Sequence, residues 1–170
     1  MTQCNQSPCR PPTGPVVQLS DHPDVIALPP LVFLTFILIG AGLHYIWPIA
    51  ILPSSGAKLL GRVIISLSLA GGAWTSRQFR RWNTSFRSDR PTTRLIQTGP
   101  FHYTRNPLYL AATTLHVGIA VRVNSLWILA MLVPTLVVIT KGVIEREERY
   151  LERKFGAEYL RYKRSVRRWL

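Results

Sequence analysis

The sequence predicts an all-α, polytopic integral membrane protein with about four transmembrane helices and a C-terminal helical hairpin. Of its 170 residues, 47% are hydrophobic, yet the formal net charge is +13. Residues 77–106 and 141–170 together carry +11 of that charge, which leaves long apolar blocks between basic ones. A soluble nucleic-acid binder of this charge would have a mean hydropathy well below zero, whereas the value here is +0.13. The alternating blocks therefore indicate a membrane protein and argue against nucleic acid as a partner.

The N-terminal residues 1–24 are polar and rich in proline, which predicts a disordered or extended tail ahead of a single membrane domain at 25–170. Cys4 and Cys9 lie in this tail as an isolated pair, which is a weak signal for a metal or a disulfide. The first span is predicted at about 28–52, inside a stretch without any charged residue. It is long enough to cross a hydrocarbon core, which takes about 20 helical residues.

Three further spans are predicted from the remaining apolar blocks. The second covers about 57–79, and its Gly71-Gly72 pair is expected to allow close packing against a neighbouring helix. The third covers about 107–121 and is short. The turn at 122–125 is expected to join it in a tight hairpin to the fourth, at about 126–144.

Two helical segments are expected beyond the membrane. The last span continues as a charged helix to about Phe155, where Gly156 ends it, and a short basic helix at 158–168 follows. Lys and Arg are enriched in the cytoplasmic segments of membrane proteins. Both basic segments are therefore expected on the cytoplasmic side, and four spans place both termini there as well.

A turn-rich loop ahead of the third span is the first candidate site. Its residues 93–109 read TRLIQTGPFHYTRNPLY, with turn formers, aromatic residues and two arginines directly before a helix. Gly99 and Pro100 predict a sharp turn. Asn106-Pro107 begins a helix whose free N-terminal amides favour an anionic group. A basic loop that only contacts phospholipid headgroups is the alternative interpretation.

A pair of carboxylates on the charged extension of the fourth span is the second candidate site. On the predicted helix 144–155, Glu147 and Glu148 flank an apolar stripe and do not lie on the opposite face. Carboxylates beside an apolar stripe, just below the bilayer, need a cationic side chain or a cationic ligand. Arg105 and Arg94 from the preceding loop are the candidate partners, and a solvated charged helix is the alternative interpretation.

These motifs resemble the isoprenylcysteine carboxyl methyltransferase family, which is broadly related to the membrane phospholipid methyltransferases. The resemblance covers about residues 85–170, half of the chain. Its matching tracts are LIQTGPF at 95–101, RNPLY at 105–109, EERYL at 147–151 (the family's E-E-x-x-L), and Phe155-Gly156 followed by Tyr159 and Tyr162. The order and spacing of these tracts around a helical hairpin make the resemblance specific.

The resemblance implies a cytoplasmic cofactor site for S-adenosylmethionine, between the loop before the third span and the extension of the fourth. Carried over position by position, the cofactor contacts fall on Thr93, Arg94, Leu95, Ile96, Phe101, Asn106, Pro107, Leu108, Tyr109 and Glu147. Aromatic rings suit the adenine and the sulfonium, the helix N-terminus suits the carboxylate, and Glu147 suits the amine or the ribose hydroxyls.

Arg105 and Glu147 are the expected catalytic residues, with Arg105 orienting a carboxylate of the cofactor or of the acceptor. No metal is expected, because the four histidines do not form a ligand-spaced cluster. Three positions depart from the family. Asn106 replaces its common His, and Ala111 replaces a Gly two residues after the Tyr. Val143 replaces an arginine that is implicated in substrate contact in eukaryotic members. The valine argues against a prenylcysteine carboxylate as acceptor and leaves the cofactor site intact.

The sequence therefore predicts an S-adenosylmethionine-dependent membrane methyltransferase whose acceptor is small or lipid-like, with a carboxylate, thiol or amine nucleophile. Two other functions are kept beside it. An NADPH-dependent membrane sterol-type reductase has a similar hairpin and loop, although the Glu147-Glu148 pair is unlike those enzymes. A non-catalytic membrane adaptor would use the basic face to hold anionic lipid or a partner protein.

Overall fold

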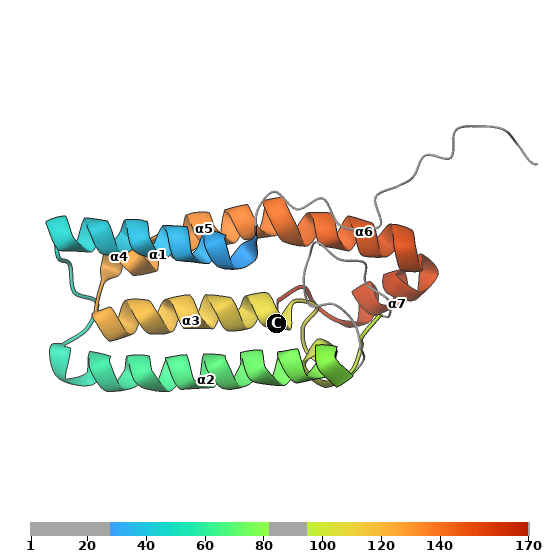
Figure 1. Ribbon diagram of the computed structural model, residues 1–170, viewed down its shortest axis with the longest axis horizontal. Helices are drawn as coiled ribbons and strands as arrows, with labels where there is room; N and C mark the ends of the chain where they lie inside the picture. Colours follow the sequence, from blue (N-terminus) through green and yellow to red (C-terminus); the bar gives the residue numbers. More distant parts are fainter. Residues whose placement is uncertain (1–27, 82–94, 170) are drawn as a thin grey trace, which may run out of the picture.

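The computed structural model describes residues 28–81 and 95–169, and within them all regular structure is helical. The long helices run side by side along one direction (Figure 1). The all-α fold class predicted from the sequence is therefore confirmed. The predicted N-terminal tail with Cys4 and Cys9, and the predicted site residues Thr93 and Arg94, lie outside the described residues.

The first two helices are α1 (Pro29–Ile46) and α2 (Ser54–Arg81). Pro29 stands at the start of α1, as helix N-termini favour. The helix ends at Ile46, earlier than the predicted end at residue 52, because Pro48 and Pro53 cannot continue it.

The rest of the chain forms a hairpin and a terminal helix. The elements are the 3-10 turn η1 (Gly99–His102), α3 (Pro107–Val123), α4 (Leu126–Ala130), α5 (Leu132–Ile139), the π-helical turn η2 (Thr140–Ile144), α6 (Glu145–Phe155) and α7 (Ala157–Ser165). From α4 to α6 the chain is one long helix, interrupted only by η2 and by a turn at Met131. Gly156, with φ 49°, separates α6 from α7, as predicted.

Three helices are long and apolar enough to cross a membrane: Pro29–Ile46, Gly56–Arg81 and Leu126–Phe155. The helix at Pro107–Val123 is apolar but shorter, in line with the short third span predicted. Large apolar side chains cover the outside of these helices, and Leu38, Leu67 and Val133 are each more than 60% exposed. Such outward apolar faces suit contact with lipid, so the fold is that of an integral membrane protein.

The predicted hairpin between α3 and α4 is present and is closed by two polar residues. Asn124 adopts the left-handed conformation, with φ 60°, and the hydroxyl oxygen of Ser125 accepts a hydrogen bond from the amide of Ile128. The Asn124 side chain also accepts from the amides of Ile51 and Leu52, both at 2.9 Å. One turn therefore fastens the hairpin to the link between α1 and α2.

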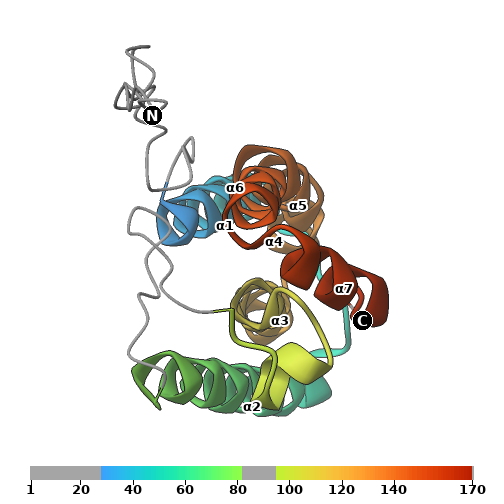
Figure 2. The same ribbon diagram turned by 90° about the vertical axis from the view of Figure 1, so that its right-hand side faces the viewer.

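The helices form three layers, with α3 between α2 on one side and the α1–α6 group on the other (Figure 2). Helices α2 and α3 approach closely at Gly61, where an added Cβ would come within 2.5 Å of the Arg122 backbone. The prediction of close packing at Gly71-Gly72 is wrong. Gly71 has open space around it, and the nearest atom to a Cβ on Gly72 is 3.8 Å away, because this part of α2 stands further from its neighbour.

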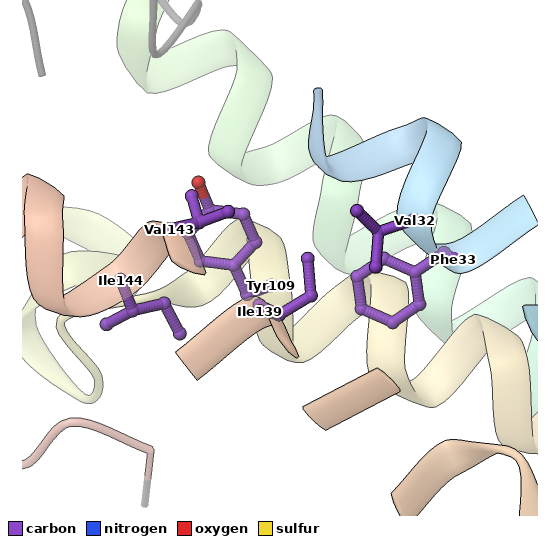
Figure 3. Close-up of a cluster of buried hydrophobic side chains, with 6 residues drawn as sticks. All are labelled: Val32, Phe33, Tyr109, Ile139, Val143 and Ile144. Carbon is purple, nitrogen blue, oxygen red and sulfur yellow. The ribbon is translucent and has the colours of Figure 1, made fainter. Parts of the chain in front are cut away.

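An apolar cluster joins α1, α3 and the long helix that runs from α4 to α6. It consists of Val32, Phe33, Tyr109, Ile139, Val143 and Ile144 (Figure 3). Phe36, Ala112 and Trp169 pack against it. The start of α3, the end of α2, and helices α6 and α7 all lie at one end of the molecule (Figure 1). The sequence motifs are therefore gathered at that end.

Candidate functional site

Tyr109 and Glu147 meet at the junction of α3 and α6. The Tyr109 hydroxyl donates a hydrogen bond to Glu147 Oε1 at 2.8 Å, between residues 38 positions apart in the chain. Tyr109 is buried in the apolar cluster, and Glu147 is half-buried. The π-helical turn η2 directly precedes α6, and such turns are frequent at functional sites. Two residues on which the family resemblance rests thus lie side by side.

Glu148 is the buried carboxylate of the site, with 5% of its surface exposed. Arg168 forms a bidentate contact with it, donating from Nε to Oε1 at 3.1 Å and from Nη2 to Oε2 at 2.8 Å. Arg105 Nη1 lies 3.3 Å from Oε1, and Lys163 Nζ lies 3.9 Å from Oε2. The cationic partner that the carboxylate pair required is therefore present, and Arg105 contributes to it.

Arg105 keeps unused hydrogen-bonding capacity although its side chain is only 10% exposed. Its Nε and Nη1 atoms are buried and find no hydrogen-bond acceptor among the described residues. The contact with Glu148 is thus an ion pair that lacks the geometry of a hydrogen bond. A buried guanidinium with unpaired N–H groups is costly, unless an anion of a ligand completes it.

The segment that follows α7 lies against the loop before α3. The backbone carbonyl of Arg168 accepts hydrogen bonds from Asn106 Nδ2 at 2.9 Å and from Thr104 Oγ1 at 3.1 Å. The Arg105 amide donates to the carbonyl of Arg167 at 3.0 Å. The predicted helix at 158–168 is therefore too long. The helix ends at Ser165, where Val166 turns to an extended conformation, and the carbonyls of Arg167 and Arg168 accept hydrogen bonds from the loop.

Helix α7 places two tyrosines beneath this loop. The Tyr162 hydroxyl donates to the Phe101 carbonyl at 2.7 Å, and Tyr159 is 1% exposed beside the arginine–glutamate cluster. Burial, with the negative charge of Glu148 as the next cause, raises the pKa of Tyr159 to about 12, against the opposing effect of Arg105. Burial also raises the pKa of Tyr162. Both hydroxyls keep their protons at neutral pH.

The hydrogen bond to Glu148 raises the pKa of Arg168 above its ordinary value, against a smaller lowering by burial. Arg168 is therefore a permanent cation of the site. Since Lys163 also contacts Glu152 and Arg168 lies 3.9 Å from Glu145, three cations face three carboxylates in one network.

The front part of the loop packs against α2. Ile96 is buried, Leu95 is half-buried, and the Phe101 ring meets Phe79 edge to face at 5.5 Å. Gly99 has φ +65°, and a Cβ there would come within 2.7 Å of the Gln78 side chain, so a glycine is needed. Beside it lies an open pocket of about 380 Å³, lined by Gln78, Arg81, Thr98 and Gly99.

The predicted site residues are thus distributed over two neighbouring places. Arg105, Asn106, Tyr109 and Glu147 converge where α3 meets α6. Phe101 instead packs on α2. Pro107 and Leu108 form the first turn of α3.

Sequence reasoning missed Arg168, Lys163 and the buried role of Tyr159. The tyrosine lies in a tract that resembles the family, but no periodic pattern marks Arg168, which stands outside any helix and acts through tertiary contacts.

Comparisons with known proteins identify the family of the chain. Residues 57–158 match the model of the phospholipid methyltransferase family, and they include η1, α3 and the carboxylate pair on α6. A stretch of 63 residues, 37% of this chain, is 51% identical to an uncharacterized protein of Haemophilus influenzae and covers 90% of that protein. No solved structure matches the chain. Because the family match spans more than half of its residues, the chain belongs to the phospholipid methyltransferase family and is a membrane methyltransferase.

Proposed function

We propose that the protein transfers a methyl group from S-adenosylmethionine to a lipid-like or small acceptor at the end of the molecule where α3 meets α6. The observation that carries this proposal is Arg105, a guanidinium held nine-tenths buried beside a carboxylate pair with two N–H positions unused by the described residues. The family supports methyl transfer as the reaction.

The residues present fit the cofactor. Its carboxylate is the kind of anion that Arg105 lacks, because guanidinium and carboxylate form strong charge-assisted hydrogen bonds. Glu147 accepts from Tyr109, and a carboxylate is the kind of acceptor that suits an amine or a ribose hydroxyl. The other cofactor contacts that the family resemblance implies are Thr93, Arg94, Leu95, Ile96, Phe101, Asn106, Pro107 and Leu108.

The chemistry asks the chain for positioning and for exclusion of water. When bound, the sulfonium cofactor would supply an electrophilic methyl group: the acceptor lone pair would bond to the methyl carbon as its bond to sulfur breaks, and S-adenosylhomocysteine would leave. Arg105 from the loop and Glu147 from α6 would orient the reactants. Tyr109 holds Glu147 in place, and the apolar cluster around its ring keeps water away from that side.

An amine or a thiol suits the acceptor side better than a carboxylate. Val143, where an arginine would hold a carboxylate, is 1% exposed within the apolar cluster. The family's name refers to phospholipids, so the acceptor that we propose first is the amine of a phospholipid headgroup. The exposed apolar helix faces would let a lipid approach within the bilayer, and both termini are proposed to be cytoplasmic from the charge of the two basic segments.

Calorimetric titration of the detergent-solubilised protein with S-adenosylmethionine, S-adenosylhomocysteine and NADPH tests the proposal. Heat from the first two ligands and none from NADPH is expected. Arg105→Gln should lower the affinity for S-adenosylhomocysteine by about 10- to 100-fold, the range expected when a charge-assisted hydrogen bond is lost. The matched control is Arg161→Gln, an exposed arginine of α7.

Binding of NADPH alone would replace the proposal with a reductase, and binding of none of the three would favour an adaptor. Transfer of labelled methyl into phosphatidylethanolamine, a thiol or a prenylcysteine then identifies the acceptor. Labelling of the prenylcysteine carboxylate alone would contradict the acceptor class proposed here.

A further inference from the structure

We propose that Arg168 is a positioning residue: by occupying Glu148, it leaves Nε and Nη1 of Arg105 available for the anionic part of the ligand. The inference rests on the proposed function, since it concerns how the same site prepares Arg105. It adds a residue that lies beyond the matched family region and that the sequence motifs do not include.

Both arginines compete for one carboxylate. Arg168 uses both oxygens of Glu148, at 3.1 Å and 2.8 Å, in the planar fork that guanidinium and carboxylate groups form. Arg105 reaches only Oε1, at 3.3 Å, and forms no hydrogen bond there. The stronger contact of Arg168 therefore prevents Arg105 from using up its own N–H groups on Glu148.

The main chain of the same segment sets the position of Arg105. The Arg168 carbonyl accepts from Thr104 and Asn106, the residues on either side of Arg105, and the Arg105 amide donates to Arg167. Arg168 is thus bonded to α6 through its side chain and to the loop through its backbone. It fixes the distance between Glu148 and the loop that carries Arg105.

The charges around Glu148 explain how Arg168 would favour the binding of an anionic ligand at Arg105. Without Arg168, Glu148 would be left with Arg105 and the more distant Lys163, and an anionic ligand would have to draw Arg105 away from the carboxylate. With Arg168 present, Glu148 is neutralised by a second cation that has one-third of its side chain exposed. Arg105 then keeps an attractive charge for a ligand carboxylate.

The test compares Arg168→Gln with wild type for two ligands: S-adenosylhomocysteine and its decarboxylated form, which lacks only the carboxylate. Wild type is expected to prefer the carboxylated ligand by at least 10-fold. Arg168→Gln should reduce that preference at least 5-fold, because Arg105 turns to Glu148, while the decarboxylated ligand binds as before. A loosened structure would weaken both ligands equally. The control is Arg167→Gln, whose exposed side chain leaves its carbonyl in place.

A second variant tests the cause. Glu148→Gln combined with Arg168→Gln removes the competing carboxylate and should restore the preference to within about 3-fold of wild type, provided that melting shows both variants to be folded. An unchanged preference in Arg168→Gln, an equal loss for both ligands, or no recovery in the double variant overturns the inference. Failure of wild type to bind S-adenosylhomocysteine overturns the proposed function, and the inference with it.

Discussion

The Tyr109 hydroxyl hydrogen-bonds to Glu147 at 2.8 Å and so ties the first turn of α3 to the charged helix α6. The bond joins a residue of the loop motif to a residue of the carboxylate motif. Tyr109 also belongs to the apolar cluster, so its ring is held by packing while its hydroxyl orients a carboxylate.

Removal of that hydroxyl tests its contribution. Tyr109→Phe is expected to lower the affinity for S-adenosylhomocysteine about 3- to 10-fold. One hydrogen bond contributes about 1 kcal/mol, and Glu147 would lose its fixed orientation. Tyr103→Phe, at an exposed tyrosine of the same loop, should leave the affinity unchanged. Calorimetry measures both variants, and equal affinities would remove Tyr109 from the site.

Glu148 is expected to matter more for stability than its neighbour Glu152. Glu148→Gln leaves buried Arg105 without its counter-charge and half-buried Arg168 with only Glu145 at 3.9 Å, which should cost about 2 kcal/mol, below the value for a fully buried pair. Glu152→Gln, at a partly exposed pair with Lys163, should cost less than about 1 kcal/mol. Thermal melting in detergent compares the two, and a larger loss for Glu152→Gln would contradict the network described here.

Two glycines of α2 should respond in opposite ways to alanine. Gly61→Ala places a Cβ within 2.5 Å of the Arg122 backbone, so the helices must separate, at a cost of about 1–3 kcal/mol. Gly71→Ala meets open space and should stabilise the helix by about 0.5–1 kcal/mol. Melting temperatures provide the measurement. Similar values for both variants would place the α2–α3 contact elsewhere.

Tyr159 predicts a loss of stability in alkali. Its pKa is about 12 in the folded protein and about 10 in the unfolded chain. Between about pH 10 and 12, the unfolded chain therefore releases the proton while the folded protein keeps it. Stability from this residue is complete below pH 10 and falls as the pH rises to about 12, by at most about 2–3 kcal/mol. Tyr159→Phe should melt with a shallower dependence on pH between 9 and 12. An unchanged slope would show that the hydroxyl is accessible to water in the folded state.

Much of the fold was predictable because its boundaries depend on local chemistry. Proline cannot continue a helix and glycine readily adopts positive φ, so Pro29, Pro107 and Gly156 mark element ends in the sequence as in the structure. The Gly71-Gly72 prediction failed because a pair of small residues does not show how close the neighbouring helix comes.

The candidate site was predictable in part. Composition and spacing placed Arg105 and the carboxylate pair within reach of each other. The contribution of Arg168 was not predictable, because its place depends on hydrogen bonds from Thr104 and Asn106 to its backbone carbonyl, across more than 60 positions of the chain. Propensity favours a helix through this basic segment, and tertiary bonding overrides it after Ser165.

The π-helical turn Thr140–Ile144 separates the apolar helix α5 from the charged helix α6. Such a turn holds one residue more than an α-helical turn, and loss of that residue closes it into an ordinary α-helix without rotating the segments on either side. The same loss elsewhere in the helix would turn everything beyond it by about 100° and move Glu147 away from Tyr109. This turn is therefore the position at which the last membrane helix can change its length by one residue and still present its carboxylates to α3.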